Sequence, residues 1–402
     1  MEPATKRPTL SAADGGVMLS SDVLWEILLR VPAKQLCCFR TACRLWRSLL
    51  SDPSFLKAHA ALHPDLILAL AGDNDRIDMT DLSGNVIRQI SIAPKDVGMP
   101  QHPGPFYLFQ DDNRVRVVDP DTGAASTLPF DGIQRSVGLR FEGSYALGRV
   151  ASTGQHKVLR VVSRYNFPVS RLIEQHCHVF TVGGDRWRPM ASAPLCVMFN
   201  NAVDSIIPNN VVIQGVVYLL PHRMYPSFDI LGANNAVIDT NCIMSFDLEA
   251  EEWRPATLPA PPAATNNTGW ELKLAKLNGS LVMLRHSHGL HGGHPMAEID
   301  TWFATDLEKG VWVKELIIRL EFPKLHPWMS APDVRLLRVL DDGRVVFYYS
   351  GNRSTGNWSW PEPDWRTQIY DPRTKSYTDV PQHGARYIAG MYGGSVPCLE
   401  SQ

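Results

Sequence analysis

The sequence predicts a mainly β protein that begins with a small all-α module. From about residue 20 to 62 the apolar side chains are spaced as in helices, whereas from Leu66 onward short apolar runs alternate with Gly, Pro, Asn and Asp. In this second region, strand–turn–strand segments recur about every 60 residues, a period typical of a β-propeller. We therefore expect a three-helix module followed by a β-propeller of about six four-stranded blades.

Composition narrows the class of protein. The chain has 402 residues, of which 44% are hydrophobic and 20% charged, as in ordinary folded proteins. With a net charge of −2 and scattered Lys and Arg, nothing favours nucleic acid or an anionic membrane as a partner. No apolar run approaches the ~18 residues of a membrane span. The seven cysteines form no C-x-x-C pair, which favours reduced thiols in the cytoplasm and/or nucleus.

The change in pattern also gives the domain organisation. We expect a disordered tail over residues 1–17, the helical module over residues 18–62 and the propeller over residues 66–396.

Three helices are expected in the helical module. Ser20, Ser21 and Asp22 can cap the first helix, and Pro32 should end it and open the second. The sequence "SDP" at 51–53 interrupts the pattern before a last short helix from Phe55 to Leu62. So small a unit seldom buries all of its own apolar surface. The rest of the chain, or a partner, must cover the excess.

The segment "LSSDVLWEILLRVPAKQLCCFRTACRLWRSLLSDPSFLKAH" resembles an F-box. It departs mildly from the family pattern, with Ser20 in the place of a Pro and Val31 in the place of a Leu. The resemblance implies docking on a Skp-type adaptor, and through it on a cullin, in an SCF ubiquitin ligase. The spare apolar face would then lie in a groove of the adaptor. The alternative is a helical hairpin folded wholly into this chain's own core.

The residues that we assign to the adaptor contact follow the apolar spacing and the F-box pattern. They are Val23, Leu24, Ile27, Leu28, Pro32, Leu36, Phe39, Arg40, Cys43, Trp46 and Leu49. Some of them, notably Trp46, could instead hold the module's own small core.

The strand pairs of the larger region share a polar turn. Five segments align on one turn residue, namely Asp119, Thr181, Asp247, Asp306 and Asp371. In all but the first, an aromatic residue follows six positions later, namely Trp187, Trp253, Trp312 and Tyr377. One blade cannot bury both faces of its sheet, but blades stacked around a ring can. We expect the aromatic series to pack between blades.

A second series of hairpins is interleaved with the first, centred on Gly143, Gly215, Gly279 and Gly343. Two hairpins per period make four strands. Four blades are clear, and residues 66–130 supply one or two degenerate blades, so five or seven blades remain possible beside six. A strand at residues 387–393 is expected to pair with an early strand and close the ring. A β-sandwich is the rival architecture, but it does not explain the period.

This region resembles the plant F-box-associated and kelch-related domains, through "MSFDLEAEEWR", "LAKLNGSLVML" and "IYDPRTKSY". The resemblance implies a propeller that recruits a target protein for ubiquitination. Targets commonly bind the loops at one face of a propeller. The candidate insertions are residues 225–235, 260–268, 287–295 and 351–365, and the last contains Trp358, Trp360 and Trp365.

Two histidine-rich stretches have simpler interpretations than a metal site. "RHSHGLHGGHPM" holds four histidines within nine residues, but its Gly-rich spacing fixes no ligand geometry, so we expect a surface loop. "HCH" at 176–178 alternates as a strand does, with Cys177 facing away from both histidines. We expect no metal and no cofactor.

No catalytic motif is present, and we expect a non-catalytic subunit. Two alternatives remain beside the substrate receptor. One is an adaptor-bound scaffold that never recruits ligase substrates. The other is a propeller enzyme with active groups scattered over several blades.

Overall fold

The computed structural model divides the chain into two compact units. They are Met1–Leu66 with Tyr392–Gln402, and Ile67–Met391. The description covers residues 20–31, 36, 39, 43–63, 65–71, 76–91, 106–110, 115–120, 122–129, 139–166, 171–193, 210–220, 242–261, 271–291, 294–321, 334–340, 342–352, 363–381 and 385–392. The predicted tail over residues 1–17 lies outside it.

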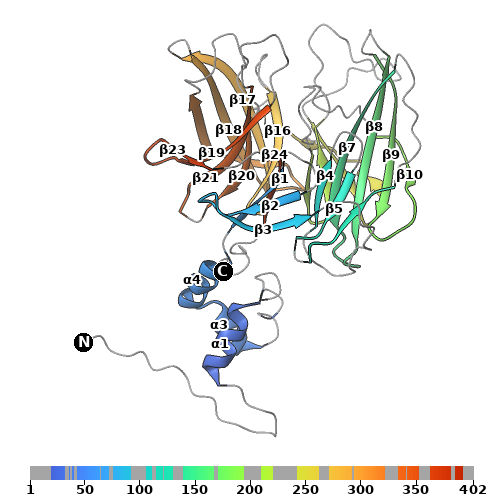
Figure 1. Ribbon diagram of the computed structural model, residues 1–402. Coiled ribbons are helices and arrows are strands. Elements are labelled where there is room, and N and C mark those ends of the chain that lie inside the picture. Colours follow the sequence, from blue (N-terminus) through green and yellow to red (C-terminus); the bar gives the residue numbers. More distant parts are fainter. Residues whose placement is uncertain are drawn as a thin grey trace. The chain divides into compact units, whose positions relative to one another are not determined.

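The smaller unit is helical (Figure 1). Its helices are α1 (Ser21–Leu29), α3 (Arg44–Leu50) and α4 (Pro53–Leu62). Ser20 caps α1, because its Oγ accepts a hydrogen bond from the backbone N–H of Val23 at 3.3 Å. Asp52 caps α4 in the same way, and Pro53 stands at a first-turn position that needs no N–H donor. None of the helices in these ranges is long and apolar enough to cross a membrane.

One helix boundary differs from the apolar spacing. The spacing predicts a continuous helical pattern through Cys43, but Cys43 has an extended backbone and caps α3. Its Sγ accepts from the N–H of Trp46 at 3.5 Å, which satisfies a donor at the start of the new helix. Leu36 and Phe39, before this break, are helical. The apolar stripe therefore continues across two helical segments.

The larger unit is a six-bladed propeller, as predicted. In the order in which the strands pair, blade 1 contains β24 (Ala385–Tyr392), β1 (Leu66–Ala71), β2 (Arg76–Thr80) and β3 (Val86–Ser91), and blade 2 contains β4 (Tyr107–Gln110), β5 (Val115–Val118) and β6 (Ala125–Thr127). Blade 3 contains β10 (Arg188–Met190), β9 (Arg171–Thr181), β8 (His156–Asn166) and β7 (Leu139–Arg149), and blade 4 contains β11 (Asn210–Ile213), β12 (Val216–Leu219), β13 (Cys242–Asp247) and β14 (Glu252–Trp253), with β15 (Leu258–Pro259) also paired to β13. Blade 5 contains β16 (Glu271–Leu277), β17 (Ser280–His291), β18 (His294–Asp306) and β19 (Val311–Glu321), and blade 6 contains β20 (Val334–Val339), β21 (Val345–Asn352), β22 (Pro363–Asp371) and β23 (Ser376–Val380).

The ring closes in blade 1, where β24 pairs with β1. This confirms the prediction that a C-terminal strand returns to an early one. Residues 66–130 supply three described strands to each of two blades, and the six separate sheets overturn the β-sandwich alternative.

One predicted hairpin is misplaced. Gly143 lies inside β7, opposite Val162 of β8, and not at a turn. The chain turns after Val150, and Gly154 takes the left-handed conformation there, with φ of +71°. Gly154 stands 61 residues before Gly215, which makes the glycine series more even than the predicted one.

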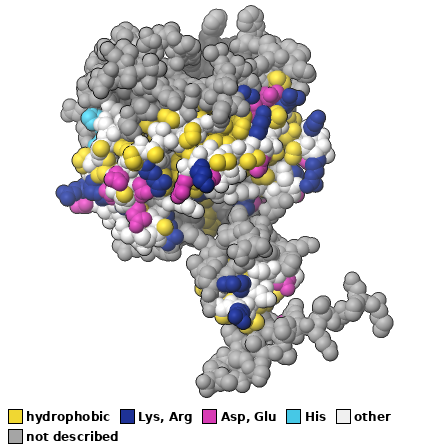
Figure 2. All heavy atoms as spheres, turned by 180° about the vertical axis from the view of Figure 1, so that it is seen from behind, with side chains coloured by type: hydrophobic (Ala, Val, Ile, Leu, Met, Phe, Trp, Pro, Cys, Tyr) yellow, Lys and Arg dark blue, Asp and Glu magenta, His cyan; other side chains and the backbone are white. Residues whose placement is uncertain are grey.

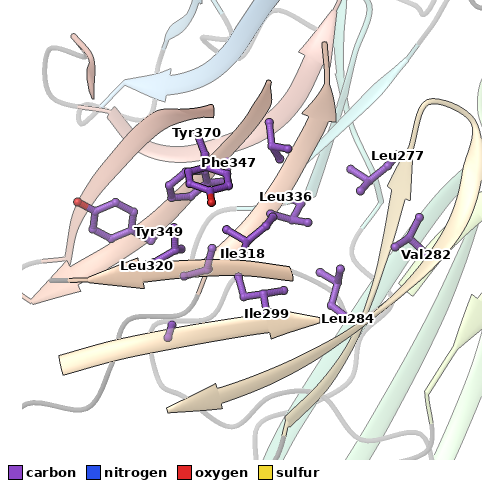
Figure 3. Packing of buried hydrophobic residues seen from close by; sticks show 13 residues of the cluster. Leu277, Val282, Leu284, Ile299, Ile318, Leu320, Leu336, Phe347, Tyr349 and Tyr370 are labelled. Carbon is purple, nitrogen blue, oxygen red and sulfur yellow. The ribbon is translucent and has the colours of Figure 1, made fainter. Parts of the chain in front are cut away.

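The propeller core lies between the blades. Figure 3 shows the wedge between blades 5 and 6, where Leu277, Val282 and Leu284 lie near Leu336 and Phe347. Alternate residues of β17 face opposite sides of its sheet. Val282 and Leu284 belong to this wedge, whereas Met283 belongs to the cluster between blades 4 and 5. The sheet of blade 5 therefore buries both faces, as a ring of stacked blades requires.

Candidate functional site

Helix α1 exposes an apolar pair. Val23 and Ile27 are each 46% accessible, and their spacing of four residues puts them on one face of the helix. Leu45 of α3 is also exposed, at 36%. Figure 2 shows Lys or Arg side chains on the described surface of this unit, and Arg44 and Arg47 beside Leu45 are exposed. The smaller unit thus carries apolar side chains on its surface with cations next to them.

The other side of α1 is buried. Leu28, 1% accessible, and Leu29 pack with Leu36, Leu50 and Phe55 in the core of the smaller unit. Two of the residues that we assigned to the adaptor contact, Leu28 and Leu36, therefore help to hold the helices together. Their support of a docking surface would be indirect.

The other residues that we assigned to the adaptor contact differ in their exposure. Leu24, Phe39, Trp46 and Leu49 are half-buried at the margin of this core. The rings of Phe39 and Trp46 meet edge to face at 5.0 Å. Cys43 is exposed and caps α3. Pro32 and Arg40 lie outside the described residues. Contact of any of these residues with an adaptor stays a prediction.

A histidine pair that the sequence did not single out connects α4 to the end of α1. His59 Nε2 lies 2.8 Å from the carbonyl oxygen of Val31, and His63 Nε2 lies 2.9 Å from that of Leu29. The two rings stack at 4.2 Å. Burial lowers the pKa of His59, the hydrogen bond to Val31 partly offsets this, and His63 lowers it further. The neutral imidazole thus donates to a carbonyl left free at a helix end.

The blades of the propeller have two different ends. Thr80, just before the turn at Asp81, pairs with Ile67 near the start of β1. The polar turns at Asp247, Asp306 and Asp371 each join the third and fourth strands of their blades, as that at Asp81 does. These turns lie at the end of the blades where β1 begins, which we call the turn end. The chain enters the propeller there.

The opposite end, which we call the loop end, is where the predicted insertions begin and finish. Residues 225–235 follow β12, residues 260–268 follow β15, and residues 351–365 span the β21–β22 connection. Trp358 and Trp360 lie outside the described residues. Trp365 belongs to β22, opposite Ser350 of β21. The topology brings the ends of the flanking strands to one face of the ring.

The predicted histidine loop is wrong. β17 extends to His291 and β18 begins at His294, so the stretch is a hairpin of two long strands. The main-chain hydrogen bonds of that pairing, which sequence spacing does not show, outweigh the loop character of its glycines. His286 is buried, with Nδ1 3.4 Å from Nζ of Lys273. No group of three His, Cys, Asp or Glu within the described ranges is arranged to hold a metal ion.

The interpretation of "HCH" is correct. His176 and His178 lie on β9, and the buried Cys177 between them packs into the cluster shared with blade 4. His178 and its cross-strand partner, Arg160 of β8, lie on the face of the sheet opposite to Cys177.

Two family profiles match the chain. The profile described as "F-box domain" matches residues 18–58, and that described as "F-box associated beta propeller domain" matches residues 99–389. Similar curated proteins come from Arabidopsis thaliana. The F-box protein At3g57590 is 26% identical over 369 residues, 84% of this chain and 83% of that protein. The F-box protein CPR1 is 22% identical over 369 residues, 81% of each. The F-box protein At3g17500 is 24% identical over 254 residues, so the match covers 60% of its length, less than two thirds.

Proposed function

The chain belongs to the F-box proteins that carry an F-box associated beta propeller domain, and we propose that it is the substrate-recognition subunit of an SCF-type cullin ubiquitin ligase. In this role the helical unit binds a Skp-type adaptor, and through it a cullin. The propeller recruits a target protein. Ubiquitin transfer takes place on other subunits, so this chain needs no catalytic residues of its own.

The observation that carries the proposal is the exposed apolar pair on α1. Val23 and Ile27 are half accessible although the unit has its own core of Leu28, Leu36 and Phe55. Burial of the remaining accessible half of such a side chain in a groove contributes about 1 kcal/mol before ordering costs. Leu45 adds apolar area, and the exposed Arg44 and Arg47 favour a groove with acidic groups at its rim.

For the target we propose the loop end of the propeller. The chain enters at the turn end, so a target at the loop end leaves that entry unobstructed. Simultaneous binding of adaptor and target would raise the local concentration of target lysines near the loaded conjugating enzyme. The receptor would thus act through proximity.

The adaptor contact can be tested by Ile27→Asp in the full chain and a purified Skp-type adaptor. Ile27 is exposed, so the charge should leave the fold intact but be intolerable in an apolar interface. We expect the affinity, measured by calorimetry, to fall at least about tenfold. Leu24→Asp is a poorer test, because Leu24 packs against the helical core.

A matched control is Val311→Asp. Val311 of β19 is 45% accessible, nearly the same as Ile27, but belongs to the propeller. It should bind the adaptor as the unchanged chain does. Equal affinity of the Ile27 variant and the unchanged chain would refute the assigned contact.

A separate experiment distinguishes a receptor from an adaptor-bound scaffold. If the chain recruits targets, its removal from cells stabilises proteins that co-purify with its propeller. If it is a scaffold, cullin still co-purifies but the half-lives of the bound proteins do not change.

A further inference from the structure

Aromatic residues connect neighbouring blades at four positions around the ring. In each case the side chain lies in the last strand of one blade, or just before it, and donates to a main-chain carbonyl of the preceding blade. The pairs are Trp187 with Pro129 at 2.9 Å, Trp253 with Ala191 at 3.0 Å, Trp312 with Pro259 at 2.9 Å, and Tyr377 with Arg319. These connections join blades 2 to 3, 3 to 4, 4 to 5 and 5 to 6.

The interface between blade 6 and strands β1–β3, which we call the closing seam, is built differently. Trp253 pairs with Phe246, the residue before its turn Asp. The equivalent partner of Thr80, the residue before Asp81, is Val86. Val86 has no side-chain donor and is 47% accessible. The aromatic position of the closing seam therefore supplies no hydrogen bond to the preceding blade. The equivalent position in blade 2, Ala125, supplies none either, but there Arg88 of β3 donates to the carbonyl oxygen of Pro120 at 2.7 Å.

Two buried hydroxyl groups face this seam. Thr80 lies opposite Ile67, and Thr367 lies opposite Tyr348; both partners belong to the apolar cluster between blades 6 and 1. Both hydroxyl oxygens are buried and have no hydrogen-bond partner among the described residues. A buried hydroxyl without a partner destabilises the state that buries it, because opening returns the group to water.

Blade 1 also combines the two ends of the propeller. β24 and β1 are held by strand pairing and are more than 300 residues apart in the chain. Loop closure over so long a separation costs entropy that local hairpins do not pay. The packing at the seam must therefore hold together strands that the chain itself does not join.

We propose that the ring opens at the closing seam, where β1, β2 and β3 separate together from β24 and blade 6 while the other blades stay packed. β1 begins at Leu66, shortly after α4 ends at Leu62. The strands that open are therefore those that the chain joins directly to the helical unit.

Hydrogen exchange of the full chain, followed by mass spectrometry, tests the proposal. Amides whose hydrogen bonds join β24 to β1 should exchange at least about tenfold faster than those between β17 and β18. Thr80→Val with Thr367→Val keeps the side-chain shapes and removes both hydroxyls. This double variant should slow exchange at β24 and β1 by about tenfold.

The matched control is Thr301→Val in β18. The Thr301 hydroxyl is also buried, but it donates to the carbonyl of Leu316 at 3.2 Å and accepts from its N–H at 3.0 Å. Its loss should speed exchange in blade 5 and leave the closing seam unchanged. The proposal is overturned if β24 and β1 exchange as slowly as β17 and β18, or if the double variant speeds exchange at the seam.

Discussion

The indole N–H of Trp253 donates a hydrogen bond to the carbonyl oxygen of Ala191, across the seam between blades 4 and 3, at 3.0 Å. The ring also meets Phe246 edge to face at 5.2 Å. A single side chain thus connects the last strand of one blade to the end of the last strand of its neighbour. The sequence predicted that the aromatic series packs between blades, and this geometry confirms it.

Trp253→Phe keeps an aromatic ring but removes the N–H donor. We expect it to lower the free energy of unfolding by about 1–2 kcal/mol, through the hydrogen bond and the smaller ring. Trp253 is half-buried, so Trp253→Ala should cost less than the about 3–5 kcal/mol of a fully buried indole. Urea unfolding followed by circular dichroism measures both. An unchanged midpoint for the Phe variant would show that the hydrogen bond contributes nothing.

A carboxylate bridges the same two blades. Glu251 accepts from Nζ of Lys157 at 2.8 Å and from the guanidinium of Arg188, both in blade 3. Glu251→Gln should destabilise the propeller by about 1–3 kcal/mol, because the buried Lys157 loses its counter-charge. Glu252→Gln alters the exposed neighbour and should change stability by less than about 0.5 kcal/mol. Comparable losses in both variants would contradict this role of Glu251.

The same carboxylate makes the seam sensitive to acid. Burial raises the pKa of Glu251, but the hydrogen bonds from Arg188 and Lys157 outweigh it and leave the pKa below 4.5. A folded-state pKa below the unfolded one gives stability that is complete above pH 4.5 and is lost as the pH falls through the folded value. The free energy of unfolding of Glu251→Gln should therefore fall less steeply with decreasing pH in this acidic range than that of the unchanged chain.

The sequence predicted most of the propeller because each blade repeats a turn whose chemistry is local. Asp247 Oδ1 accepts from the N–H groups of Glu249 and Ala250, so the pattern is visible without any tertiary contact. The turn at Asp81 was not aligned with this Asp series. Its N–H bonds to the carbonyl of Asn85, four residues on, whereas that of Asp119 bonds to Ala124, five residues on. Because this turn is shorter, the cross-strand partner of the residue before it comes five positions after Asp81, at Val86, and that partner is not aromatic.

The candidate docking surface was harder to predict. Helical spacing puts Ile27 and Leu28 in the same stripe, yet one is exposed and the other is 1% accessible. Only the packing of three helices around Phe55 decides which residues turn inward. Leu45 was missed, although an apolar residue outside the stripe is itself a signal of an exposed contact. The role of His59 depends on a carbonyl group left free just after α1, and helical spacing alone does not predict where that group lies.

Two turn glycines offer a comparison of backbone and packing. Gly310 has φ of +66°, and a Cβ there would lie 2.5 Å from Cγ of Pro259 in the preceding blade. Gly279 has φ of +84°, but a Cβ there would meet nothing within 4 Å. We expect Gly279→Ala to cost about 1 kcal/mol and Gly310→Ala about 2–4 kcal/mol in urea unfolding. Equal costs would mean that the turn at Gly310 shifts away from Pro259 without penalty.

His59 should make the helical unit sensitive to mildly acidic pH. Burial is the main reason that its pKa lies below 6.5, so the unfolded chain binds a proton more readily than the folded one. The stability linked to this group is complete above pH 6.5 and is lost as the pH falls through the folded pKa. Protection of α1 amides, corrected for intrinsic exchange rates, should therefore drop between neutral and mildly acidic pH. His59→Gln, which can still donate to the Val31 carbonyl but does not titrate, should remove this dependence. If the variant keeps the same pH dependence as the unchanged chain, another group is responsible for it.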